Sequence, residues 1–113
     1  MKRFLISFDD GSMDHISEQD FPAVGEASHA VVQQAKDAGV WIFGGGLHRQ
    51  QASIVRTNGT VTDGPYPETK AVVGGFSIIE VPTREAALEW AAKIAVACRC
   101  DQEVREMIFD PES

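Results

Sequence analysis

The order in which strand and helix patterns follow one another constrains the fold of this chain more than any other feature. Strands alternate apolar and polar residues, whereas helices place apolar residues three and four positions apart. The sequence predicts strands at 3–8, 40–43, 52–57, 60–62, 72–81 and 100–109, with helices from about 21 or 22 to 38 and from 83 onward. This β-α-β, hairpin, β-α-β order is typical of an α+β, ferredoxin-like β-α-β-β-α-β fold with an extra hairpin.

Short-range signals mark the ends of these elements. Asp20 and Thr83 each stand where a helix N-cap is expected, and Gly39 can end the first helix in the left-handed conformation. The glycine runs 44–46 and 74–75 interrupt strand patterns, which indicates a β-bulge or a close approach of the backbone. At 74–75 we also expect the missing side chains to leave room for a ligand.

Apolar residues on both faces of the strands predict an assembly. Two helices can cover only one face of such a sheet. Between residues 76 and 81, however, Phe76 and Ile78 point to one face while Ile79 and Val81 point to the other. With 113 residues, 43% of them hydrophobic, the chain has the size of a single domain, residues 1–113. We therefore expect a homodimer in which a second sheet covers the open face.

Composition narrows the classes of function. The formal net charge is -7, with 17 acidic against 10 basic residues, so a nucleic-acid partner is not expected. No apolar run approaches the length of a membrane span. Cys98 and Cys100 have a spacing that we place on a strand and interpret as reduced thiols, which favours a cytoplasmic location. His15, His29 and His48 fit no zinc pattern, so neither a metal nor a cofactor is expected.

One segment carries a family resemblance. Residues 61–94 read VTDGPYPETKAVVGGFSIIEVPTREAALEWAAKI, and this stretch resembles the DGPF branch of the YCII-related family. Weaker similarity extends over nearly the whole chain. The resemblance implies a ferredoxin-like protomer that dimerises sheet to sheet, as in a dimeric α+β barrel. It also implies a small pocket lined by a histidine and an aspartate, although no reaction is assigned to most members.

The candidate catalytic residues are His29 and Asp63. An imidazole exchanges protons near neutral pH, and an adjacent carboxylate fixes its tautomer and stabilises its charged form. Each residue also has a structural interpretation: Asp63 can stabilise the proline-rich turn that it begins, and His29 can be a solvated helix residue at the edge of the polar face. The candidate substrate-binding residues are Ser28, His48, Tyr66, Glu68, Thr69 and Lys70.

Two functions remain open at this point. The first is a cofactor-independent acid-base enzyme, lyase-like or isomerase-like, that acts on a small metabolite in a pocket near the Asp63-Gly64-Pro65 turn. The alternative is a small-ligand-binding or regulatory module without catalysis, linked to sigma-factor signalling as the resemblance implies. An acid-base pair within hydrogen-bond reach inside a pocket favours the enzyme, and a pocket without that pair favours the module.

Overall fold

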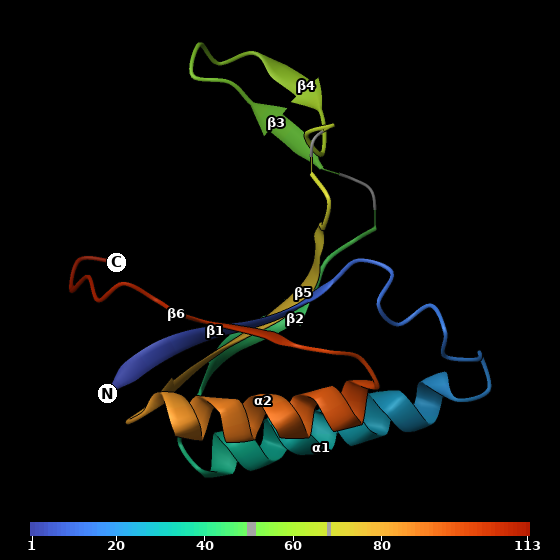
Figure 1. The fold of residues 1–113 in the computed structure, drawn as a ribbon, viewed down its shortest axis with the longest axis vertical. Coiled ribbons are helices and arrows are strands. Elements are labelled where there is room, and N and C mark those ends of the chain that lie inside the picture. Colours follow the sequence, from blue (N-terminus) through green and yellow to red (C-terminus); the bar gives the residue numbers. More distant parts are fainter. Residues whose placement is uncertain (50–51, 68) are drawn as a thin grey trace.

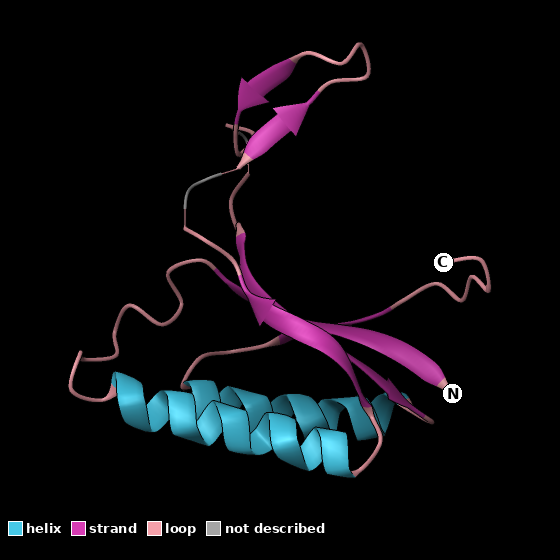
Figure 2. Ribbon diagram, turned by 180° about the vertical axis from the view of Figure 1, so that it is seen from behind, coloured by secondary structure: helices cyan, strands magenta, loops and turns pink. Residues whose placement is uncertain are grey.

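The computed structural model describes residues 1–49, 52–67 and 69–113 and has a ferredoxin-like fold (Figure 1). Its elements are β1 (Lys2–Asp9), α1 (Phe21–Asp37), β2 (Trp41–Gly46), β3 (Ser53–Val55), β4 (Val61–Asp63), β5 (Val73–Val81), α2 (Arg84–Cys98) and β6 (Glu103–Glu106). The main sheet has the antiparallel order β2-β5-β1-β6, and β3 pairs with β4 in a separate two-stranded sheet. Both helices lie on one face of the main sheet (Figure 2), so the predicted fold class is confirmed.

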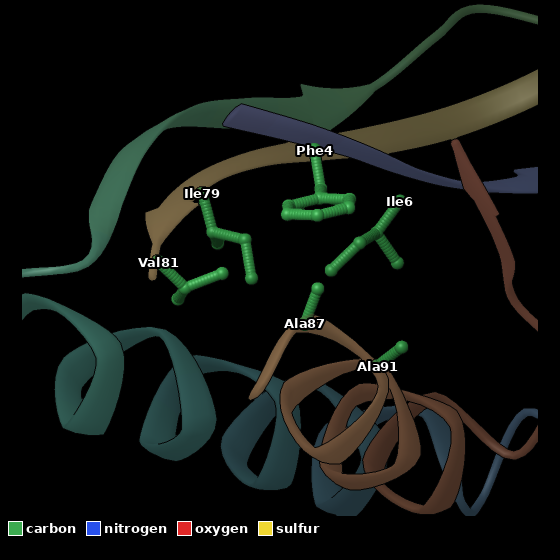
Figure 3. Packing of buried hydrophobic residues seen from close by; sticks show 6 residues of the cluster. All are labelled: Phe4, Ile6, Ile79, Val81, Ala87 and Ala91. Carbon is green, nitrogen blue, oxygen red and sulfur yellow. The ribbon is translucent and has the colours of Figure 1, made fainter. Parts of the chain in front are cut away.

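The core lies between this sheet and α2. Phe4 and Ile6 of β1 and Ile79 of β5 are fully buried and meet the small side chains of Ala87 and Ala91 (Figure 3). Because the facing side of α2 carries alanines, the large strand residues can fill the space between the sheet and the helix. Burying each of those large side chains stabilises the fold by about 1.5–3 kcal/mol. The predicted division of β5 into two faces is therefore confirmed on the helix side.

The structure tests the three residues predicted at helix ends, and it confirms Thr83 as a cap and Gly39 as a stop. The Thr83 hydroxyl accepts a hydrogen bond from the Ala86 amide at 3.1 Å, and Gly39 takes the left-handed conformation with φ +73°. Asp20 is the N-cap residue of α1 as predicted, but its side chain makes no capping hydrogen bond. Its carboxylate instead accepts a hydrogen bond from the Arg99 guanidinium at 3.1 Å. This contact joins segments distant in sequence, so local pattern cannot reveal it.

Gly44, Gly74 and Gly75 lie where the backbone packs closely against neighbouring atoms, whereas a Cβ at Gly45 or Gly46 would meet no atom within 4 Å. A Cβ on Gly44 would lie 2.6 Å from the carbonyl oxygen of Phe76, and one on Gly74 would lie 2.8 Å from Cα of Asp10. The ring of Phe8 fills the space beside Gly75. The expected room for a ligand at 74–75 is therefore absent, because a neighbouring aromatic side chain and the backbone occupy it.

The region of the two cysteines differs from the predicted strand. Cys98 is the last residue of α2, and Arg99 then turns the chain with φ 57° before Cys100. Both cysteines are free, and β6 begins only at Glu103. The strand placement is wrong because α2 continues through Cys98. Within residues 1–49, 52–67 and 69–113, no helix combines the length and hydropathy needed to cross a bilayer.

Candidate functional site

A cavity of about 530 Å³ lies beside α1, β2 and β5, and we call it the α1–β2 cavity. Its polar lining includes Ser28, His29 and Lys36 from α1. Its aromatic lining is Phe8, Trp41, Phe43 and Phe76. The Ser28 hydroxyl donates a hydrogen bond to the Gly25 carbonyl oxygen at 3.0 Å, which orients this side chain along the helix. The volume and the mixture of aromatic walls with a few polar groups are typical of small-molecule sites.

The lining of the α1–β2 cavity includes two basic side chains, His29 and Lys36. His29 and Lys36 lie seven residues apart, two helical turns, and therefore share one face of α1. No aspartate or glutamate occurs among the described residues that line the cavity. Such a site suits a ligand with an anionic or electron-rich group. The residues present can position such a group and exchange a proton through His29.

Cys98 also lines this cavity but is a poor nucleophile there. Burial raises the pKa of the Cys98 thiol above its ordinary value. Burial also raises the pKa of Cys100, and the nearby Cys98 and Asp101 add to that shift. Both thiols therefore remain mainly protonated at neutral pH. The reactive form of cysteine is the thiolate, so neither residue is a ready nucleophile. A thiol-based mechanism therefore has no support.

Most of the predicted binding residues lie elsewhere in the protomer. Ser28 and His29 line the α1–β2 cavity, where Ser28 is half-buried and His29 is exposed at the helix surface. His48 is also exposed, just beyond β2, but does not line this cavity. Asp63 is the last residue of β4, exposed and opposite Ser53. Within one protomer the structure does not bring Asp63 to the cavity that contains His29, and the catalytic role of both stays a prediction.

The turn after β4 forms a separate polar group. The Arg56 guanidinium lies over the Tyr66 ring, 5.5 Å from its centroid, and the Thr69 amide donates a hydrogen bond to the Tyr66 carbonyl oxygen at 3.0 Å. Lys70 is exposed. Glu68 lies outside the described residues. The expectation that these residues border the pocket is not met by the protomer's α1–β2 cavity, because β3 and β4 extend away from it (Figure 1).

Sequence reasoning missed some cavity residues. Lys36 carried a usable signal, because its spacing from His29 places both on one helix face. Trp41 packs against the core and also lines the cavity. Gln102 carried no local signal, since it reaches the site only through the turn after α2.

An ion-pair cluster holds the segment after β2. Arg49 Nε lies 3.2 Å from an Asp10 carboxylate oxygen, and its guanidinium also contacts the Asp14 carboxylate. Asp14, followed by Asp10, raises the pKa of Arg49 above its already high value. The cluster ties the chain between β2 and β3 to the loop after β1. Among the described residues, no three His, Cys, Asp or Glu side chains gather as a metal site would require.

Comparisons with known proteins place the fold. The sequence matches the profile of the YCII-related domain over residues 5–108. The structure is similar to 5-chloro-2-hydroxyhydroquinone dehydrochlorinase from Burkholderia phenoliruptrix AC1100 in complex with 2,5-dihydroxybenzoquinone, with a TM-score of 0.53, 16% sequence identity and 97% of each chain covered. At that identity the similarity shows the fold alone. Comparison with curated protein sequences gave no significant match.

Proposed function

Because this chain belongs to the YCII-related family, we propose that it is a cofactor-independent acid-base enzyme of the lyase or isomerase type. Its substrate is a small polar or aromatic metabolite that binds in the α1–β2 cavity. The observation that carries the proposal is the position of His29, which lines a cavity of about 530 Å³ beside Lys36 and four aromatic residues. We also assign the chain to the DGPF branch on the strength of residues 63–66.

The chemistry needs only proton transfer by His29. In an isomerisation, the neutral imidazole accepts a proton from a substrate carbon, the released electron pair shifts along the substrate, and the imidazolium returns the proton to another atom. In an elimination, that electron pair forms a double bond while the leaving group departs with its own bonding pair. Lys36 can stabilise the negative charge that develops in either case. Neither step needs an oxidant or a reductant.

The structural comparison supports this class of reaction and substrate. The similar protein is a dehydrochlorinase solved with a hydroxylated quinone. The α1–β2 cavity has aromatic walls from Trp41, Phe43 and Phe76 against which a planar ring can pack. A hydroxylated ring that carries negative charge also fits the ammonium group of Lys36 beside His29.

The test uses 2,5-dihydroxybenzoquinone and a panel of small hydroxylated aromatic acids. Binding is followed by NMR shifts of the labelled protein, and turnover or exchange of carbon-bound hydrogen is followed by NMR in D₂O. We expect His29→Gln to reduce the catalysed rate by about 10²-fold or more. His48→Gln is the matched control, because His48 is exposed and not among the residues that line this cavity. Equal rates in the two variants would contradict the proposal.

A ligand-binding or regulatory module linked to sigma-factor signalling is the second candidate. The observation in its favour is that the described lining of the α1–β2 cavity lacks a carboxylate to pair with His29. The same experiment separates the two functions. Compounds that bind in the cavity but neither react nor exchange hydrogen, in the wild type and in His29→Gln alike, support the module.

We further propose a cytoplasmic homodimer that packs sheet to sheet. The open face of the sheet, the face turned away from the helices, carries the cross-strand neighbours Leu5, Ile78 and Phe43, and Phe43 is 62% exposed. A second copy can cover these apolar residues. Light scattering should report a dimer at micromolar concentration. Ile78→Glu should weaken this dimer, whereas Val96→Glu should not, because Val96 is exposed on the outer face of α2. A stable wild-type monomer would contradict this assembly.

A further inference from the structure

The hairpin formed by residues 52–66, which we call the arm, does not fold back onto its own protomer. It contains β3 and β4 and projects away from the helices and the main sheet in both views (Figures 1 and 2). The radius of gyration is 15.7 Å, against about 13 Å for a compact domain of this length. The protomer is therefore more extended than a self-contained domain, and the arm accounts for much of the extension.

The arm is well formed internally but carries uncovered apolar side chains. The Arg56 amide donates to the Thr60 carbonyl oxygen at 2.8 Å, and the Gly64 amide donates to the Ala52 carbonyl oxygen at 2.9 Å. Val55 and Val61 face each other across the two strands, 69% and 63% exposed.

An isolated two-stranded hairpin is at best marginally stable in water. A hairpin with this exposed valine pair needs another surface to pack against.

The arm carries a carboxylate, which the described lining of the α1–β2 cavity lacks; the arm's one cation, Arg56, lies over the Tyr66 ring. The cavity contains His29 and Lys36, and its described lining includes no carboxylate. The arm presents the exposed Asp63 at the end of β4. Among the described residues, no hydrogen bond or ion pair engages the Asp63 carboxylate. The described lining of the cavity thus lacks a carboxylate, and the arm presents one.

We propose that two copies of this chain exchange arms, so that Asp63 of one copy lies beside His29 of the partner subunit. The arm leaves the sheet after β2 and returns into β5, and both strands border the cavity. Arg49 holds the chain just before the arm through its contacts with Asp10 and Asp14. A two-fold axis makes the exchange reciprocal and closes the assembly at two chains.

The exchange deepens the proposed function and rests on it, since it supplies the carboxylate that a proton-transferring imidazole uses. Asp63 is in this role a positioning residue. Its carboxylate fixes the tautomer of the partner's His29 and stabilises the imidazolium. Each site is incomplete in a single copy and complete only in the dimer.

Isotope-selective NMR tests the exchange without any substrate. Labelled Asp63→Asn chains are mixed with a large excess of unlabelled wild-type chains, so that nearly every labelled His29 faces a partner with an intact Asp63. We expect the His29 imidazole resonances to return from their Asp63→Asn positions to their wild-type positions. In the reciprocal mixture, labelled wild-type chains with excess unlabelled Asp63→Asn chains, they should move to the variant positions. Asp63→Asn keeps the side-chain shape at an exposed site, so the fold is preserved.

Other outcomes overturn the exchange in distinguishable ways. If the His29 resonances follow the labelled chain's own residue 63 in both mixtures, the pair forms within one copy, and the proposed function stands without the exchange. If they do not respond to residue 63 in any sample, Asp63 is not beside His29 in either copy. The effect of His29→Gln on turnover then decides the proposed function independently. A wild-type protein that stays monomeric also refutes the exchange.

Discussion

The substitution Gly44→Ala tests the packing of β2 against β5. A Cβ at residue 44 would lie 2.6 Å from the Phe76 carbonyl oxygen, 2.9 Å from Cη2 of Trp41 and 3.0 Å from Cα of Ser77. Two of these three atoms belong to the backbone of β5, so a change of rotamer cannot relieve the contact. Overpacking of this kind destabilises a fold by about 1–3 kcal/mol. For a domain of this length each kcal/mol lowers Tm by about 4 °C.

Gly46→Ala is the matched control, because a Cβ there has no atom within 4 Å. The free energy of unfolding should then change by no more than about 0.5 kcal/mol. Urea unfolding followed by circular dichroism gives both values, at one fixed protein concentration because dimerisation makes apparent stability concentration-dependent. Equal losses in the two variants would refute the reasoning, since strand propensity and not the contact with β5 would then account for the effect.

Three further predictions concern the helix cap, the core and a thiol. Thr83→Ala should lower the free energy of unfolding by about 1 kcal/mol, because the Ala86 amide loses its acceptor; in urea unfolding Thr83→Ser should retain most of this stability. Ile79→Val should cost about 0.5–1.5 kcal/mol by the same measurement, since Ile79 is fully buried. Val96→Ala removes more carbon atoms but should be near neutral, because Val96 is 81% exposed. In a Cys100→Ser background, Cys98 should react with iodoacetamide more slowly than a peptide thiol at pH 8, and its rate profile should lie at higher pH, because burial raises its pKa. Mass spectrometry of the alkylated protein measures this, and a profile like that of a peptide thiol would contradict the burial argument.

Interactions between neighbouring residues determine the features that the sequence predicted best. The hairpin turn at Asn58-Gly59 forms with Gly59 at φ +87°, because the conformation of a turn depends on the residues within it. The Thr83 cap depends only on an amide three residues away. The order of strands and helices follows from periodicity and leads to the ferredoxin-like sheet. These features need no knowledge of distant contacts.

The tertiary structure decided the features that depend on competition between distant groups. Asp20 had the right local context for a cap, but Arg99, 79 residues away, takes its carboxylate. The glycines at 74–75 had the pattern of a ligand-facing backbone, but the Phe8 ring on the adjacent strand fills that space. A hydrogen bond or a void is available to a residue only when nothing else in the folded chain occupies it.

The candidate site divides in the same way. The sequence determined that His29 and Lys36 share a face of one helix, because their spacing is two turns. It also determined that Asp63 begins a turn after a hairpin strand. Only the tertiary structure decided that His29 lines a cavity and that the hairpin carries Asp63 away from it. Helical and hairpin geometry are set by hydrogen bonds between nearby residues, whereas the direction in which a hairpin leaves a sheet depends on the packing of the whole chain.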